Sequence, residues 1–202
     1  TLELTGRGNI QIRGVTDTDA VAAAVAAAGL LPSVTHERVR NIVASPLSGR
    51  SGGVCDIRGL VTALDTAVQQ DPRLARLPGR FLFALDDGRG DVSGLGADAG
   101  IHALDDSTAA LLLAGRDTGV RLCIPDAVTE LSSLAARFTE MRGNCWRVDE
   151  LGDPLTLLGA RQAPPPANGP VVAAPAAAGP AVDLSAIVGA HLFGVAGAAD
   201  SG

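Results

Sequence analysis

The first fifteen residues, TLELTGRGNIQIRGV, alternate between polar side chains at the odd positions up to 13 and leucine, isoleucine or glycine at the even positions. This period of two predicts a β-strand with one face on a core. The polar face carries Arg7, Asn9, Gln11 and Arg13. The alternation fits two interpretations, a strand whose outer face is solvated and a strand that presents these four side chains to a ligand.

Residues 16–29, TDTDAVAAAVAAAG, follow this strand with a short alanine-rich run. Helix-start and helix-stop signals bound the run. Thr16 or Thr18 is the expected N-cap, and Gly29 with Pro32 is the expected end. The sequence therefore predicts one short helix here.

Two further segments, 57–70 and 127–141, place apolar residues at the three- and four-residue spacing of amphipathic helices. Pro125 precedes the second segment, at a position compatible with a first helical turn. Both segments are predicted to be helices that face a core. The apolar face of the first holds Leu60, Leu64, Ala67 and Val68, and that of the second holds Val128, Leu131, Leu134 and Phe138.

The remaining patterns predict strands and loops. Residues 80–90, RFLFALDDGRG, form a strand that ends in a turn, and residues 107–125 form a hairpin of two apolar runs around Gly115–Gly119. Residues 36–53 pass from a polar start, interpreted as the end of a helix, into a Ser/Pro/Gly loop. Together these elements predict an α+β fold, with order ending near Leu158.

The composition changes after this point. Residues 161–202 begin with a Pro/Ala/Gly-rich, nearly uncharged run that predicts a disordered C-terminal linker. The closing DLSAIVGAHLFGVAG has no sequence after it to complete a sheet, and the strand at residue 2 needs partners elsewhere. Both ends are therefore expected to be cut.

Charge and cysteine content narrow the function classes. All 16 basic residues are arginine, 22 residues are acidic, and the net charge of -6 argues against general nucleic-acid binding. The three cysteines are far apart, form no CxxC pair and are interpreted as reduced thiols of a cytoplasmic protein. The histidines are isolated, so no metal site is expected. The most apolar run is shorter than the roughly 20 residues of a membrane span, so no membrane partner is expected.

Three stretches occur in order along the chain: LTGRGNIQIRGV, RNIVASPLSGRSGG and LPGRFLFALDDG. Together they resemble the nitrite/sulfite reductase superfamily. The closer likeness is to the precorrin-3B synthase family of aerobic cobalamin biosynthesis. Its members carry an L-T-x-R-x-N-x-Q-x-R-G strand, an R-N-x-x-x-x-P-x-x-G loop and an L-P-x-K/R-F strand ending in D-D-G. The match covers roughly residues 1–150.

The resemblance implies a duplicated fold in which each half pairs a ferredoxin-like piece with a larger α/β domain, with a tetrapyrrole between the halves. For this chain it implies a partial ferredoxin-like half-domain over residues 1–34, an α/β sulfite-reductase-type domain over 35–160 and a linker over 161–202. The second half would then be a missing partner. The implied activity is the hydroxylation of precorrin-3A with dioxygen, with electrons from NADH passing through a 4Fe-4S cluster.

The resemblance also implies roles for individual residues. It places the polar face of the first strand against the acid groups of the macrocycle, and the arginine of the Arg-Asn motif over the macrocycle face. The arginine of LPGRF takes the position of a catalytic-side lysine. The candidate cofactor-binding residues are Arg7, Asn9, Gln11, Arg13 and Asn41, and the candidate catalytic residues are Arg40 and Arg80.

Two departures from the family pattern affect the expected reaction and the expected activity of this chain. Reductases have a second lysine two residues after the first, and Leu82 stands at that position here, which favours an oxygenase. The four cysteine ligands of the cluster are absent from this chain, so the chain alone is expected to be inactive. The alternatives are a fragment of a siroheme-dependent nitrite or sulfite reductase, and a non-catalytic tetrapyrrole-binding or decayed module.

Overall fold

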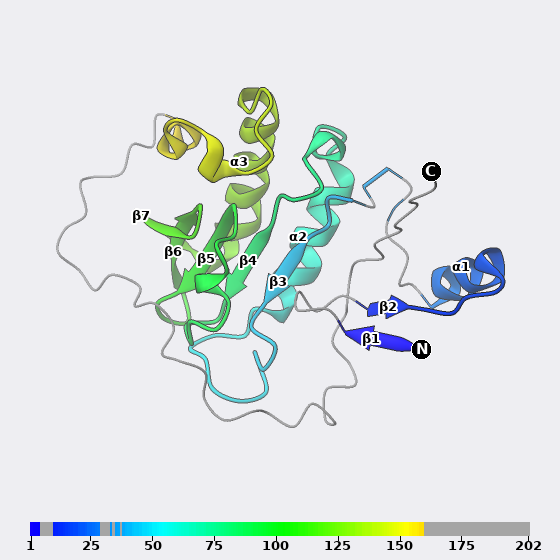
Figure 1. Ribbon diagram of the computed structural model, residues 1–202. Helices are drawn as coiled ribbons and strands as arrows, with labels where there is room; N and C mark the ends of the chain where they lie inside the picture. The colour runs from blue at the N-terminus through cyan, green and yellow to red at the C-terminus, as the bar shows by residue number, and fades with distance from the viewer. Residues whose placement is uncertain (5–9, 29–32, 34, 37, 160–202) are drawn as a thin grey trace.

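A five-stranded mixed sheet organises the computed structural model of this chain, which describes residues 1–4, 10–28, 33, 35–36 and 38–159 (Figure 1). The strand order is β3-β4-β5-β6-β7. β3 pairs parallel with β4, β4 parallel with β5, and the last two pairings are antiparallel. The strands are β3 (Ile42–Ala44), β4 (Phe83–Asp86), β5 (Ala99–Ala103), β6 (Thr108–Leu113) and β7 (Arg116–Cys123).

Two helices, α2 (Arg58–Gln70) and α3 (Ala127–Met141), pack against each other on one face of this sheet (Figure 1). Both predicted amphipathic helices are thereby confirmed, and their apolar faces point into the core. Phe81 joins the layers, because its ring lies 4.9 Å from that of Phe83 in the sheet and 5.3 Å from that of Phe138 in α3. Other fully buried core side chains are Leu64, Leu74, Leu85, Ile101, Leu111, Leu131 and Leu134.

The predicted hairpin over residues 107–125 is confirmed as β6 and β7. Its two-residue turn is Ala114-Gly115, and both residues have positive φ, as the turn type that suits twisted strands requires. Gly119 lies inside β7 rather than in the turn. Predicted residues 80–90 contain β4, which begins at Phe83, three residues after Arg80.

β3 and β5 were not predicted from the sequence. The described residues of the polar segment interpreted as a helix end, 36 and 38–41, form turns and irregular backbone that lead into β3, so that prediction is wrong. β3 is only three residues long and owes its conformation to pairing with β4. β5 begins with Ala99 and Gly100, which have weak strand propensity, and pairing with β4 on one side and β6 on the other stabilises it.

The opening segment is a hairpin and not the single strand predicted. β1 (Leu2–Leu4) pairs antiparallel with β2 (Ile10–Ile12), and Glu3 lies opposite Gln11. This register keeps odd positions on one face. The expectation that the even face lies on a core is also wrong, because Leu2 is 71% exposed and Ile12 is 42% exposed.

The predicted alanine-rich helix is confirmed as α1 (Thr18–Ala27), which buries no residue and stands away from the five-stranded sheet (Figure 1). Its N-cap is Asp17, whose carboxylate accepts a 2.9 Å hydrogen bond from the backbone N–H of Ala20. The prediction of Thr16 or Thr18 as the cap is wrong, because Thr18 already lies inside the helix. The predicted stop at Gly29 and Pro32 lies outside the described residues.

The described residues therefore form a mixed α+β fold, as the sequence predicts. The predicted linker over 161–202 lies outside the part of the chain that the structure describes. Among the described helices, none combines the length and apolarity that crossing a bilayer would require.

Gly100, in β5, has no room for a side chain against the neighbouring strand β4. A Cβ at this position would lie 2.6 Å from the carbonyl oxygen of Ala84 and 3.2 Å from its Cβ. Gly100→Ala is expected to lower the free energy of unfolding by about 1–3 kcal/mol, because the backbones of β4 and β5 must separate. Urea unfolding measures this change.

Gly59→Ala is the matched control, since a Cβ at Gly59, in α2, has no neighbour within 4 Å. Alanine favours a helix over glycine, so this variant is expected to be unchanged or more stable by up to about 1 kcal/mol. Equal stability of the two variants would contradict the packing of β4 on β5 described here.

Candidate ligand site at the start of β3 and β4

The Arg-Asn motif and the LPGRF motif meet where β3 and β4 begin. The Asn41 side-chain amide donates hydrogen bonds to the carbonyl oxygens of Arg38, Gly79 and Phe81 at 3.1, 3.0 and 3.2 Å. The backbone N–H of Phe83 donates to the carbonyl oxygen of Asn41 at 2.8 Å. Because parallel strands begin at the same edge of a sheet, residues about forty positions apart lie together here.

Arg40 is buried and points toward α2. Its Nε and Nη2 donate to the two carboxylate oxygens of Asp65 at 2.6 and 2.7 Å, and Gln69 Nε2 donates to the same carboxylate at 2.8 Å. This bidentate pair ties the start of β3 to the helix that covers it. Asp65 was not identified from the sequence. An acidic residue on the apolar face of an amphipathic helix, here with Leu64 and Val68, could have indicated a buried partner.

Arg80 lies on the surface beside Gly79, at the same edge. Gln11 and Arg13 lie instead on the separate hairpin, where Arg13 Nε donates to Glu3 at 2.8 Å and its Nη2 donates to the Gln11 side chain at 3.2 Å. Arg7 and Asn9 are outside the described residues. Of the candidates, the structure thus brings Asn41 and Arg80 to one edge of the sheet, whereas the neighbouring Arg40 side chain is buried against Asp65.

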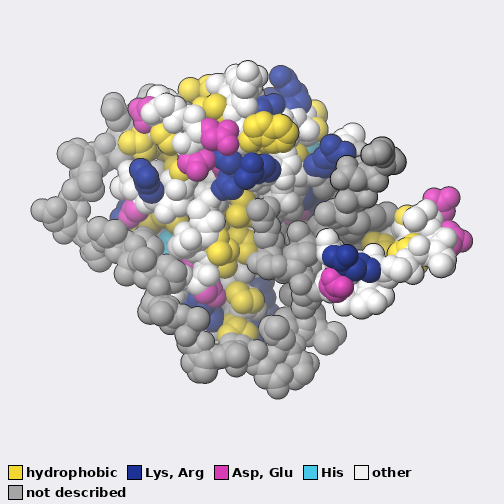
Figure 2. Space-filling view, viewed as in Figure 1, with side chains coloured by type: hydrophobic (Ala, Val, Ile, Leu, Met, Phe, Trp, Pro, Cys, Tyr) yellow, Lys and Arg dark blue, Asp and Glu magenta, His cyan; other side chains and the backbone are white. Residues whose placement is uncertain are grey.

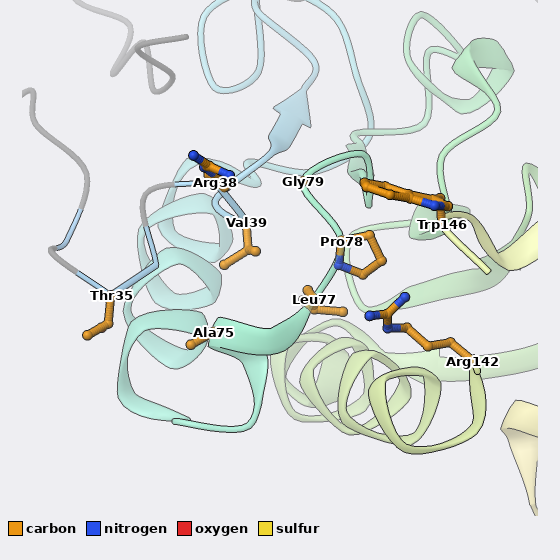
Figure 3. A pocket seen from close by; sticks show the side chains of 9 residues that line it. All are labelled: Thr35, Arg38, Val39, Ala75, Leu77, Pro78, Gly79, Arg142 and Trp146. Atoms are coloured by element: carbon orange, nitrogen blue, oxygen red, sulfur yellow. The ribbon is translucent and has the colours of Figure 1, made fainter. Parts of the chain in front are cut away.

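A cavity of about 390 Å³ borders this edge (Figure 3). Val39 and Gly79, the neighbours of Arg40 and Arg80, both line it. Its lining combines apolar residues, among them Leu77 and Pro78, with two arginines and the protein's single tryptophan. These three residues are Arg38, Arg142 and Trp146, and none of them was identified from the sequence.

Asp98 fixes the loop that carries Trp146. The buried carboxylate accepts hydrogen bonds from the backbone N–H of Val148 at 2.6 Å and of Leu82 at 2.8 Å, and from Arg147 Nε at 3.0 Å. Burial raises the pKa of Asp98, although these hydrogen bonds oppose the shift. The carboxylate therefore joins the loop after α3 to the residue just before β4.

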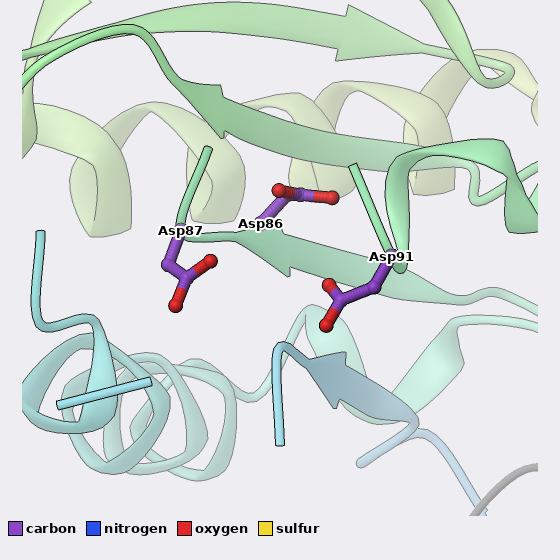
Figure 4. A group of neighbouring side chains, drawn as sticks. All are labelled: Asp86, Asp87 and Asp91. Carbon is purple, nitrogen blue, oxygen red and sulfur yellow. The ribbon is translucent and has the colours of Figure 1, made fainter. Parts of the chain in front are cut away.

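At the opposite edge of the sheet, the carboxylates of Asp86, Asp87 and Asp91 lie within 4.8 Å of one another (Figure 4). The spacing of these aspartates does not match that of a calcium-binding loop. Protein donors already bind all three groups: backbone N–H groups bind Asp86, Arg89 binds Asp87 at 2.7 Å, and Ser45 Oγ binds Asp91 at 2.6 Å. These contacts indicate a structural role for the cluster.

The residues present do not fit the implied 4Fe-4S cluster. Cys55 lies in the loop before α2, Cys123 ends β7 and Cys145 follows α3. Among the described residues, the one group of three or more metal-binding side chains is the aspartate cluster, which contains no cysteine. No electron-transfer step is therefore assigned to this chain.

On the face shown in Figure 2, arginines are scattered among acidic and apolar side chains of the described residues rather than gathered in one basic patch.

Comparisons with known proteins found no matching protein-family model and no matching curated protein. The likeness of the three sequence motifs to the precorrin-3B synthase family stays a prediction.

Proposed function

We propose that this chain is the first half of a precorrin-3B synthase-like monooxygenase and contributes part of a binding site for a polycarboxylate tetrapyrrole. In this proposal residues 1–34 are part of a ferredoxin-like half-domain, and residues 35–160 are the sulfite-reductase-type domain. The observation that carries the proposal is the set of Asn41 hydrogen bonds. They place the Arg-Asn and LPGRF motifs side by side, next to a cavity with arginines at its rim.

The chemistry of this edge suits such a ligand. Arg80 is exposed there, and a guanidinium binds a carboxylate through two parallel hydrogen bonds. The Trp146 ring, which is 55% exposed, offers contact area to a flat, apolar ring system, and the buried residues Val39, Leu77 and Pro78 line the cavity beside it. The edge therefore combines the two kinds of contact that an acid-substituted macrocycle needs.

In the parent enzyme, dioxygen and two electrons would complete the hydroxylation, with the second half supplying the cluster. The role of this chain is to bind and orient the macrocycle. A siroheme-dependent reductase is less well supported, because Leu82 cannot deliver a proton and its backbone N–H is bound to Asp98.

Arg80→Ala is expected to weaken the binding of sirohydrochlorin, a stable metal-free tetrapyrrole with many carboxylates, by about five- to tenfold. The reason is that a charge-assisted hydrogen bond at a partly exposed site contributes on the order of 1 kcal/mol. The measurement is a titration of the 202-residue chain followed by the absorption of the macrocycle.

Arg50→Ala is the control, since Arg50 is an exposed arginine in the loop after β3, outside the cavity lining. The proposal fails if the unmodified chain shows no saturable binding, or if the two variants bind with the same affinity.

A further inference from the structure

We infer that Arg142 and Trp146 form an anchor for one carboxylate-bearing side chain of the ligand, inside the cavity beside β4. The inference rests on the proposed function, since it names the part of the tetrapyrrole that enters this cavity. Neither residue belongs to the three motifs on which the resemblance is based, so the anchor extends the site to the loop after α3.

The two residues occupy one side of the cavity. Figure 3 shows the Arg142 guanidinium and the Trp146 indole next to Pro78, with Arg38 and Val39 on the far side. Arg142 is partly buried, and the described residues contain no acidic partner for it; its Nη1 donates to the Cys145 carbonyl at 2.9 Å. That bond orients the guanidinium without neutralising its charge.

Trp146 is 55% exposed, which is unusual for so large an apolar side chain. The backbone around it is nevertheless held in place. The backbone N–H of Trp146 donates to the Glu150 carboxylate at 2.6 Å, and two residues later the backbone N–H of Val148 donates to Asp98. An exposed aromatic ring on a loop fixed in this way is preorganised for a ligand, because little conformational entropy is lost on binding.

The size and charge of the cavity select the ligand group. A volume of about 390 Å³ lies at the lower end of the range for small-molecule sites, so it suits one acid side chain with the adjoining ring edge. The lining is apolar at Leu77 and Pro78, and the nearest cations are arginines in a protein of net charge -6. A carboxylate attached to an apolar arm satisfies both features.

The test uses 3-phenylpropionate, which joins a propionate to an aromatic ring, and reads the fluorescence of Trp146, the protein's single tryptophan. The expected result is a saturable change with a dissociation constant on the order of 1 mM. The uncharged 3-phenylpropanol and ring-free acetate are expected to give no saturable change. A saturable response to either would overturn the inference, because the anchor needs the charge and the apolar arm together.

Arg142→Gln is the informative variant, since its amide can still donate to the Cys145 carbonyl. It is expected to weaken phenylpropionate binding about tenfold, because it removes the positive charge. Arg142→Lys is expected to weaken binding less, because lysine keeps the charge and loses only the planar guanidinium. Arg50→Ala is the control, and an unchanged Trp146 emission maximum in the free variants shows that the loop is intact. Affinity of Arg142→Gln equal to that of the control would overturn the inference.

Sirohydrochlorin binding separates this inference from the proposed function. If Arg80→Ala weakens macrocycle binding and Arg142→Gln does not, the proposed function stands and the anchor is wrong. If phenylpropionate binds in an Arg142-dependent manner and sirohydrochlorin does not bind the unmodified chain, the carboxylate anchor stands and its assignment to a tetrapyrrole is wrong.

Discussion

Asp86→Ala is expected to lower the free energy of unfolding by about 3–5 kcal/mol, a large share of the 5–15 kcal/mol of a typical domain. The Asp86 side chain is fully buried at the end of β4. Removing it leaves a set of buried donors without an acceptor. These donors are the backbone N–H groups of Gly88, Gly90, Val92 and Ser93 at 2.9–3.1 Å and the Ser93 hydroxyl at 2.8 Å.

Urea unfolding at neutral pH measures the loss, with Asp126→Ala as the control. Asp126 is an exposed aspartate before α3 that makes no capping hydrogen bond, so its removal should change stability by no more than about 0.5 kcal/mol. A similar, small effect of both substitutions would show that the loop after β4 does not depend on the Asp86 carboxylate.

The pH dependence of stability provides a second readout for Asp86. Burial opposes its ionisation, but hydrogen bonds from His102, Gly90, Ser93 and Val92 outweigh burial and hold the pKa well below its usual range. Because the folded-state pKa is lower than the unfolded one of about 3.9, the stabilisation is complete above that value and is lost as the pH falls toward the folded-state pKa. Asp86→Asn should therefore flatten the loss of stability below about pH 4. If the variant loses stability below about pH 4 as steeply as the unmodified protein, this role of Asp86 is wrong.

Asp65→Ala is expected to destabilise the protein by about 3–5 kcal/mol, because it leaves the Arg40 guanidinium buried without its carboxylate partner. The two side chains are only 7% and 12% exposed, so solvent screens their interaction little. Urea denaturation measures the effect, and Asp126→Ala again serves as the exposed control.

The double variant Arg40→Met, Asp65→Leu tests whether the stability lost in Asp65→Ala comes from the broken ion pair or from lost side-chain volume. Replacing a buried ion pair by apolar side chains of similar volume is often neutral, so the double variant should recover most of the stability lost in Asp65→Ala. If its loss of stability equals the sum of the losses in Arg40→Met alone and Asp65→Leu alone, the pair is not coupled. Sirohydrochlorin affinity of the double variant then reports whether Arg40 also contacts the ligand.

The spacing of the second and third motifs has a structural explanation that is independent of any ligand. Asn41 joins them at the start of β3 and β4. At the other ends of the same strands, Ser45 Oγ donates to Asp91, the backbone N–H of Asp87 donates to Ser45 Oγ, and a Cβ on Gly53 would lie 2.3 Å from the Asp87 carboxylate. These residues build the parallel β3-β4 pair. The ligand hypothesis therefore needs both this pairing, which brings the two motifs together, and the exposed and partly exposed cations Arg80 and Arg142.

Local pattern alone determined much of the secondary structure. The amphipathic spacing predicts α2 and α3, and two apolar runs around a glycine predict the β6-β7 hairpin, because each of these elements is encoded by neighbours within a few residues. The alternation at the start of the chain predicts β-structure correctly. It does not show that the segment folds back on itself, since both strands of a hairpin with this register share the same parity.

Only the tertiary structure decided what lies at the candidate site. β3 and β5 are strands because of their partners, and the meeting of Asn41 with Gly79 depends on a strand pairing across about forty residues. Asp65 pairs with Arg40 because α2 covers the start of β3. Arg142 and Trp146 belong to the site because the loop after α3 lines the same cavity as Pro78. Periodicity reports which face of an element is apolar. It carries no information about which distant side chain that face will contact, because long-range packing selects the contact.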